Sequence, residues 1–277
     1  MRIANRFCKA GSARFVGADS TTSMPGGTCA TSSAESSSKT VCAVAPPVDG
    51  SLGIRLLPGV LAVTAGSVDV ISFLELGGLF TAHVTGNLVI LAAHIATGRA
   101  APIAHILSVP VFLAMLLLTR LLAAVLEETR QGLLWPLLTL QLVLLACFMA
   151  VRVAAGSGLH PDAPCAVAAG MLGVAAMAVQ NALVQITSVG PPATAVMTTD
   201  ITVFMLDVGT VLLSRDPRRV AFSRSRGRRT WPPIIGFTCG CGLGAIFEAV
   251  LGRWSIVLPI GFAMLALALG LSATRRA

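Results

Sequence analysis

Long apolar runs limit what this chain can fold into more than any other feature does. Three of them, residues 54–71, 103–126 and 133–151, approach or reach the roughly 20 residues that cross a lipid bilayer as a helix. Apolar residues make up 55% of the chain and charged residues only 12%, whereas a soluble domain has about 25% charged residues. One soluble core does not need so much apolar surface. The sequence therefore predicts an all-α, polytopic membrane helix bundle with six to eight membrane segments.

Two stretches with the same polar pattern divide the chain into halves. Residues 66–87 and 178–200 each carry a polar side chain inside an apolar segment, then a break marked by Gly or Pro, then a Thr-containing triplet. We therefore expect two internal membrane repeats, residues 54–156 and 164–273. With one inserted residue in the second break, the matched pairs are Asp69 with Asn181, Thr85 with Thr198, Asn87 with Asp200, and His94 with Asp207.

Polar residues at matched places in two apolar halves favour a site at the interface between the repeats. An ionisable side chain in the hydrocarbon region is costly unless it faces a cavity or a partner, which makes it a functional candidate. The alternative is that these side chains pair across the halves and only hold the bundle together. The candidate substrate-binding residues are Asp69, Thr85, Asn87, Asn181, Thr198 and Asp200, and the candidate proton relay is His94 and Asp207.

Glycines at helical spacing predict close helix packing. Gly236, Gly240 and Gly244 form two overlapping GxxxG steps, a pattern that lets two helix backbones approach each other. We expect this segment to begin near 231–233, and Gly66 lies in a second stripe of small residues. The seven cysteines are odd in number and show no disulfide or zinc spacing. We expect no metal and no cofactor.

The stretch 62–98 resembles the YoaK-like family of bacterial multi-pass membrane proteins, a family of unknown function. The matching pattern is an apolar run into Gly-x-x-Asp, then a phenylalanine shortly before Thr-Gly-Asn; here these are Gly66, Asp69, Phe80, Thr85, Gly86 and Asn87. In the second half the family commonly repeats Thr-Gly, whereas this chain has Thr198–Thr199. The resemblance covers about residues 55–272 and implies a location in the bacterial inner membrane and a helical architecture.

The net charge of +8 is concentrated in a few places. Residues 215–229 hold seven arginines and one aspartate between two apolar segments. The positive-inside rule predicts a cytoplasmic loop over 214–230, and makes a nucleic-acid site the weaker interpretation. The basic tail Arg275–Arg276 should lie on the same side.

The number of spans decides how the halves are oriented. If all segments cross, there are eight spans, the halves run parallel, and Arg99 and Arg152 are cytoplasmic. If 82–97 and 195–213 are re-entrant, six spans remain and the halves are inverted. Residues 1–53 are rich in Ser, Thr, Gly and Pro and are predicted to be a disordered extension.

No catalytic motif is present, so we do not expect an enzyme. We expect a secondary transporter of a small solute or ion, with the lipid bilayer as its main partner and self-association left open. The alternative is a membrane scaffold that binds a partner through the Arg-rich loop.

Overall fold

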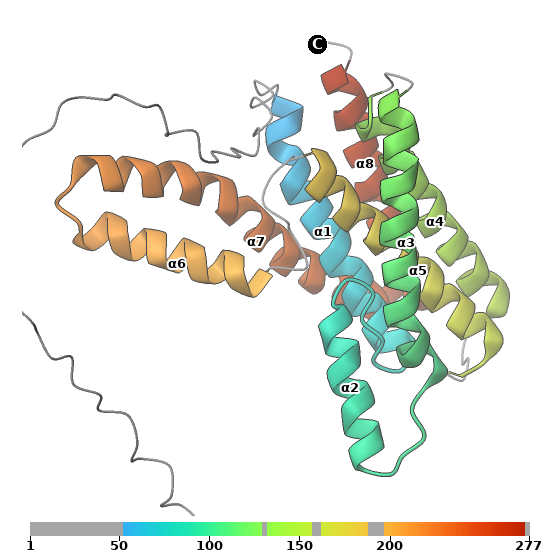
Figure 1. The fold of residues 1–277 in the computed structure, drawn as a ribbon. Coiled ribbons are helices and arrows are strands. Elements are labelled where there is room, and N and C mark those ends of the chain that lie inside the picture. The colour runs from blue at the N-terminus through green and yellow to red at the C-terminus, as the bar shows by residue number, and fades with distance from the viewer. Residues whose placement is uncertain (1–51, 129–131, 157–161, 188–196, 275–277) are drawn as a thin grey trace, which may run out of the picture. The chain divides into compact units, whose positions relative to one another are not determined.

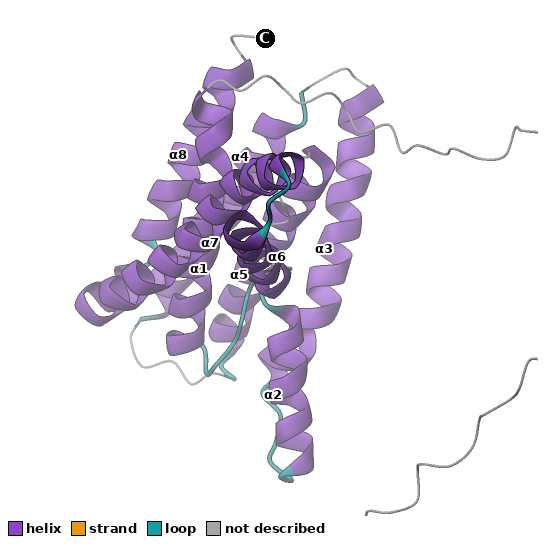
Figure 2. Cartoon of the chain, turned by 90° about the vertical axis from the view of Figure 1, so that its left-hand side faces the viewer, coloured by secondary structure: helices purple, strands orange, loops and turns teal. Residues whose placement is uncertain are grey.

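A computed structural model describes residues 52–128, 132–156, 162–187 and 197–274. The described residues form helices and no strand (Figures 1 and 2). The disordered extension predicted for 1–53 lies outside the described residues, except that residues 52 and 53 begin the first helix. The helices are α1 (Leu52–Glu75), α2 (Val84–Ala96), α3 (Ile103–Glu128), α4 (Leu134–Ala155), α5 (Pro164–Thr187), α6 (Met197–Leu213), α7 (Pro217–Leu251), a 3-10 turn (Gly252–Trp254) and α8 (Val257–Thr274).

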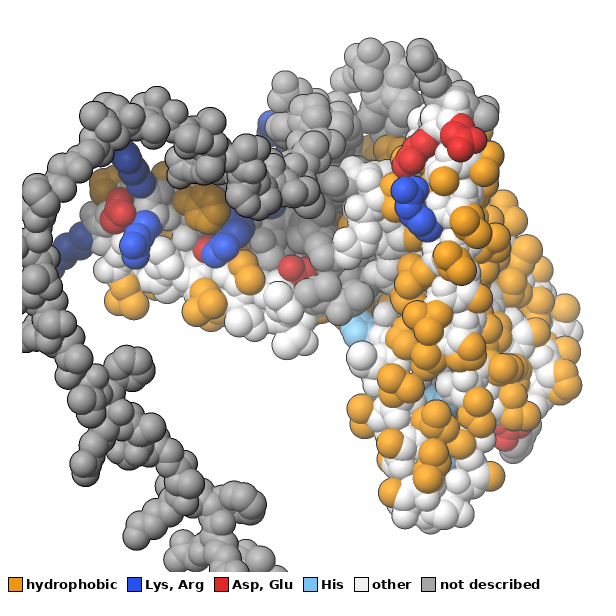
Figure 3. Space-filling view, viewed as in Figure 1, with side chains coloured by type: hydrophobic (Ala, Val, Ile, Leu, Met, Phe, Trp, Pro, Cys, Tyr) orange, Lys and Arg blue, Asp and Glu red, His pale blue; other side chains and the backbone are white. Residues whose placement is uncertain are grey.

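Five of these helices, α1, α3, α4, α5 and α7, are long and apolar enough to cross a membrane. Their exposed faces agree with contact to lipid rather than to water. On α3, large apolar side chains such as Leu113, Leu117 and Leu121 are more than half exposed. Figure 3 shows hydrophobic side chains covering the visible face of this part of the bundle. The predicted all-α membrane bundle is confirmed.

α5 lies at the centre of the bundle, and every residue from Gly173 to Val184 is buried. Its neighbours include α1, α3 and α4. Small residues let these helices approach α5 closely; a methyl group on Gly170, for example, would lie 2.6 Å from Leu79. Other helices pack on nearly all sides of α5, so its apolar surface extends around most of the helix.

Contacts along α1 fix the direction of its neighbours. α5 runs antiparallel to α1, because Gly170 lies against Leu79 whereas Gln180 donates a hydrogen bond to the carbonyl oxygen of Leu61. α7 runs parallel to α1, because its glycines contact α1 in steps of four residues on both helices. The contacts are Gly236 with Gly59, Gly240 with Val63, and Gly244 with Ser67.

α4 and α8 complete this pattern. α4 runs parallel to α1, because Gln141 reaches the level of Leu61 through Gln180 and Arg152 pairs with Glu75. α8 runs antiparallel to α1, because Gly53 at the start of α1 contacts Leu269 and Ser272 near the end of α8.

α2 lies between the end of α1 and the start of α3, and these two helix ends are neighbours. His105 of α3 lies 3.3 Å from the carbonyl oxygen of Gly78, in the turn after α1. Because the chain returns to the point that it left, α2 does not connect opposite ends of the bundle. α6 packs antiparallel on the first half of α7, where Phe204 lies near Gly227 and Asp207 contacts Arg226.

The predicted Arg-rich loop over 214–230 is wrong for most of its length. Residues 217–230 are helical and form the first part of α7, with Pro232 and Pro233 inside the helix rather than at its start. Asp216 caps this helix by accepting a hydrogen bond from the backbone of Arg218, and Pro217 occupies its first turn. Arginine also favours helix. Composition and charge therefore did not distinguish a basic loop from a basic helix.

Candidate functional site

Asp69 organises the turn that follows α1. One carboxylate oxygen accepts hydrogen bonds from the backbone N–H groups of Thr81 (2.8 Å) and Ala82 (2.7 Å) and from the Thr81 hydroxyl (2.9 Å). The other oxygen contacts Nδ1 of His83. The chain can turn back sharply because Gly77 and Gly78 have φ values of 68° and 86°, which other residues rarely adopt. Asp69 is thus a buried acid that has donors on both oxygens.

Asn87 fixes the same turn from the other side. Its side-chain oxygen accepts from the backbone N–H of Phe80 (2.9 Å), and its amide donates to the Phe80 carbonyl (2.7 Å). A methyl group on Gly86 would lie 2.8 Å from the Phe80 ring, so the glycine makes room for that ring. Thr85, two residues before Asn87, is exposed. The Phe…Thr-Gly-Asn pattern therefore describes a locked turn.

The described part of the second copy makes different contacts. The amide of Asn181 donates to the carbonyl of Met177 on its own helix, α5. Thr198 is exposed in the first turn of α6. Asp200 is buried, and its Oδ2 has no hydrogen-bond partner among the described residues. The break itself, residues 188–196, lies outside the described residues.

The two residues of the candidate proton relay lie on different helix pairs. Asp207 of α6 makes two hydrogen bonds to Arg226 of α7, at 2.8 and 2.6 Å, and the Arg226 guanidinium lowers the pKa of Asp207. A carboxylate held ionised in this way is a poor proton carrier at neutral pH. His94 lies on α2, which packs on α3. Among the described residues, no hydrogen bond or ion pair joins His94 to Asp207.

The glycines expected to pack closely lie at the contact between α1 and α7. A methyl group on Gly240 would lie 2.3 Å from the Val63 carbonyl oxygen, and one on Gly66 would lie 2.3 Å from that of Phe237. Methyl groups on Gly236 and Gly244 would lie 2.5 and 2.9 Å from atoms of α1. Any side chain at these positions would separate the two backbones. The α1–α7 contact is therefore among the closest in the bundle.

A buried polar cluster lies where the ends of α1, α4 and α7 meet. Glu75 of α1 forms an ion pair with Arg152 of α4, and the two side chains are only 8% and 7% exposed. Glu248 of α7 lies within hydrogen-bonding reach of Glu75. Buried charges are expensive in a membrane protein and commonly line substrate or ion pathways. This cluster is the strongest candidate site that the described residues contain.

Comparison with known proteins places the chain in a family. Residues 57–269, most of the chain, match DUF1275, a family described as a protein of unknown function. The chain belongs to this family. No curated protein and no solved structure matches the chain. The DUF1275 match is consistent with the resemblance to YoaK-like membrane proteins, although it does not itself carry that name.

The DUF1275 match includes all three members of the polar cluster, which the sequence analysis did not select. Glu75, Arg152 and Glu248 each lie within one turn of a helix end, where charged side chains commonly reach the headgroups. The only sequence signal was that two acids and one base lie at the ends of apolar segments. Their convergence depends on the directions of α1, α4 and α7, which the sequence did not reveal.

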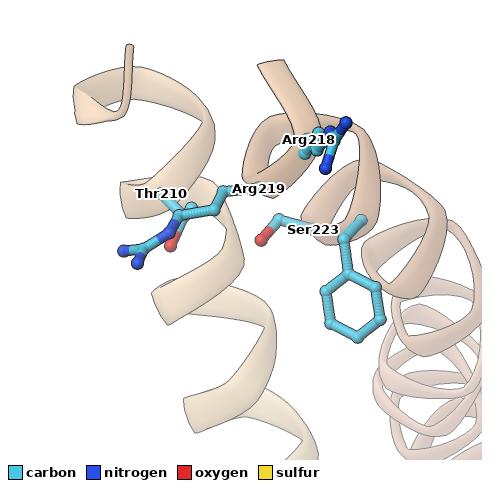
Figure 4. Close-up of a pocket in the computed structure, with 5 residues that line it drawn as sticks. Thr210, Arg218, Arg219 and Ser223 are labelled. Atoms are coloured by element: carbon cyan, nitrogen blue, oxygen red, sulfur yellow. The ribbon is translucent and has the colours of Figure 1, made fainter. Parts of the chain in front are cut away.

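A pocket and the arrangement of possible metal ligands also bear on what the protein could bind. An open pocket of about 390 Å³ lies between α6 and α7. It is lined by Thr210, Arg218, Arg219, Phe222 and Ser223, and Figure 4 shows Thr210 on one helix and Arg219 and Ser223 on the other. Within the ranges that the structure describes, no three His, Cys, Asp or Glu side chains gather as metal ligands.

Proposed function

We propose that this DUF1275 member is a secondary transporter of a small solute. The observation that carries the proposal is the buried cluster of Glu75, Arg152 and Glu248. It draws side chains from both halves of the chain, since Glu75 and Arg152 precede residue 156 and Glu248 follows residue 164. Purely structural ion pairs do not need a second buried carboxylate beside them, because the extra charge destabilises the fold.

The helix directions support this function. We count the shorter apolar helix α8 as a sixth span. The order span, short helix, span, span then occurs twice, as α1–α4 and as α5–α8. α1 and α5 run antiparallel, and so do α4 and α8. α3 begins near the end of α1 and therefore runs antiparallel to α1, whereas α7, the corresponding helix of the second half, runs parallel to α1. Inverted repeats of this kind are typical of secondary transporters, whose substrate sites lie where the repeats meet.

The same directions give a six-span topology, with α2 and α6 outside the set of spans. The Arg-rich start of α7 then lies on the same side of the membrane as Arg55 at the start of α1. Arg99 and Arg253 lie at the other end. The positive-inside rule makes the Arg-rich end cytoplasmic, in what we take to be the bacterial inner membrane. Arg152, expected on the cytoplasmic side of an eight-span protein, instead neutralises Glu75 at the opposite end.

Several residues predicted from the sequence to bind substrate or protons have structural roles in this proposal. Asp69 and Asn87 hold the turn between α1 and α2, which closes the bundle beside the cluster. Asp207 holds α6 on α7. Asp200 remains a candidate ligand because it is buried and has a free oxygen among the described residues. The proposed site is therefore centred on Glu75 and Glu248.

A ligand screen tests this function. The purified protein is screened by thermal shift in detergent against a library of metabolites, in parallel with Glu75→Gln. A solute at about 100 times its Kd should stabilise the wild-type protein by roughly 2.7 kcal/mol, and the variant should lose that stabilisation. Exposed Glu128→Gln is the matched control and should respond like the wild-type protein. A wild-type protein that no solute stabilises contradicts the proposal.

The alternative, a scaffold that binds a partner through the Arg-rich segment, has one observation in its favour. The arginines at 215, 218, 219, 224, 228 and 229 are exposed on the α6–α7 hairpin. Two of them, Arg218 and Arg219, line the pocket of Figure 4. Neutralising Arg218, Arg219, Arg224 and Arg228 while keeping Arg226 would remove this surface and leave the contact to Asp207 intact. If this variant keeps the wild-type membrane topology but no longer restores the phenotype of cells that lack the protein, the scaffold function is favoured.

A further inference from the structure

The polar cluster carries one more negative group than positive group. The charged side chains that act on Glu75 are Arg152 from α4 and Glu248 from α7. If both carboxyls are ionised, two negative charges face one guanidinium, and the net charge is −1. Glu75 and Arg152 are almost fully buried. An uncompensated charge in such surroundings destabilises the fold, so the cluster favours one further positive charge.

Carboxylate oxygens without hydrogen-bond donors mark where that positive charge is missing. Glu75 uses one carboxylate oxygen for Arg152, and its other oxygen, Oε2, is buried without a donor among the described residues. Glu248 Oε2 is buried in the same condition, and Arg152 Nε is the one buried donor of the cluster that also lacks a partner among the described residues. Two carboxyls within hydrogen-bonding reach of each other, neither with a donor at that oxygen, repel unless a proton or a metal ion lies between them. The free oxygens therefore mark one position for a cation.

Further oxygen atoms lie at the same end of the bundle. The hydroxyl of Ser72, one helical turn before Glu75, is buried and has no partner among the described residues. Ser255, in the turn between α7 and α8, is fully buried and equally unpaired. Hard cations prefer oxygen ligands from carboxylates and neutral groups. This end of the bundle therefore contains the kinds of oxygen ligand that a small, hard ion prefers.

We infer that Glu75 and Glu248 bind one monovalent cation, H⁺ or Na⁺, with Arg152 as a fixed counter-charge. Arg152 sets the valence, because it leaves a single negative charge to be neutralised and a divalent ion would leave an excess of positive charge. In the proposed transporter this cation is the coupling ion, and that role alone rests on the proposed function. Cation binding can be measured whether or not the protein transports a solute.

Two arms of one experiment distinguish the ions, using full-length protein purified in detergent. In the first, the Tm is measured against NaCl concentration at constant pH and ionic strength, with choline chloride as the replacement salt. Sodium binding predicts a rise of about 5 °C at about 100 times the Kd. In the second, infrared difference spectra at near-neutral pH are searched for the band of a protonated carboxylic acid. Proton binding predicts that band without any dependence on sodium.

Matched variants assign the signal to the cluster. Glu248→Gln removes the excess charge and should abolish whichever signal the wild-type protein shows. It should remain folded, because one carboxylate then faces one guanidinium. Glu127→Gln, at an exposed position beside Arg120, should keep the wild-type signal. The inference is overturned if the wild-type protein shows neither signal, or if Glu248→Gln retains it.

Discussion

The carboxylate of Asp69, buried near the end of α1, holds both the backbone and the hydroxyl of Thr81, twelve residues later in the chain. This contact explains why an acid stands inside an apolar helix. Its carboxylate accepts hydrogen bonds from the N–H and hydroxyl groups of the sharp turn that follows the helix. A repeated polar pattern indicated that Asp69 matters, whereas the structure shows that its carboxylate is occupied by its own chain.

Removing this acid should destabilise the fold strongly. Asp69→Ala leaves the buried N–H groups of Thr81 and Ala82 unpaired, and hydrogen bonds to charged groups contribute about 1.5–3 kcal/mol each. We expect a loss of about 3 kcal/mol, measured by thermal unfolding in detergent. Thr81→Ala removes only the hydroxyl contact and should cost about 1 kcal/mol. Equal costs for the two variants would contradict this role of Asp69.

The Thr-Gly-Asn triplet contains its own control. Asn87→Ala should cost about 2 kcal/mol, because it leaves both the N–H and the carbonyl of Phe80 without their partners. Thr85→Ala, two residues earlier and exposed, should change the free energy of unfolding by less than about 0.5 kcal/mol. If Thr85→Ala proves the more damaging change, Thr85 has a partner that the turn does not show.

Neighbouring glycines of α7 should respond in opposite directions to the same substitution. Gly240→Ala would place a methyl group 2.3 Å from the Val63 carbonyl oxygen, which should separate α1 from α7 and cost about 1–3 kcal/mol. Gly242→Ala meets nothing within 4 Å and should stabilise the helix by up to about 1 kcal/mol. Thermal unfolding of both variants measures the difference. Equal effects would mean that the α1–α7 contact is looser than described.

The pair of Asp69 and His83 should make stability depend on pH. The hydrogen bond to Asp69 raises the pKa of His83 above its usual value of about 6.5, and burial opposes this only in part. A raised pKa in the folded state means that protonated His83 stabilises the fold below about pH 6.5. That stability is lost as the pH rises through the raised pKa. The Tm difference between wild type and His83→Gln should therefore shrink from pH 6 to pH 8; a constant difference would contradict the pairing.

Arg152 should contribute more to stability than Glu248 does. Arg152→Gln leaves two buried carboxylates without a guanidinium and should cost about 3–5 kcal/mol. Glu248→Gln leaves the Glu75–Arg152 pair intact and should cost far less. The comparison is made by thermal unfolding in the same buffer. If Glu248→Gln is the more destabilising change, Glu248 rather than Glu75 is the main partner of Arg152.

The sequence predicted the helical membrane fold well because apolar runs and small-residue spacing are local properties. It also marked Asp69, Asn87 and the glycines of α7, which stand out as exceptions inside apolar segments. It did not reveal the cluster of Glu75, Arg152 and Glu248, because three charged residues near helix ends look ordinary until the helix directions are known. Nor did it show that residues 217–230 are helical, because Arg-rich loops and Arg-rich helices have the same composition.

The proposed transporter requires that the two halves of the protein are inverted across the membrane. Cysteine labelling in sealed membranes tests it, in a variant whose native cysteines are replaced. Arg99→Cys lies between α2 and α3, and Arg215→Cys lies between α6 and α7. With six spans and inverted halves, a membrane-impermeant maleimide should label Arg99→Cys from the outside and Arg215→Cys only after the membrane is permeabilised. Labelling of both positions from the same side would show eight spans and parallel halves, and would contradict the account.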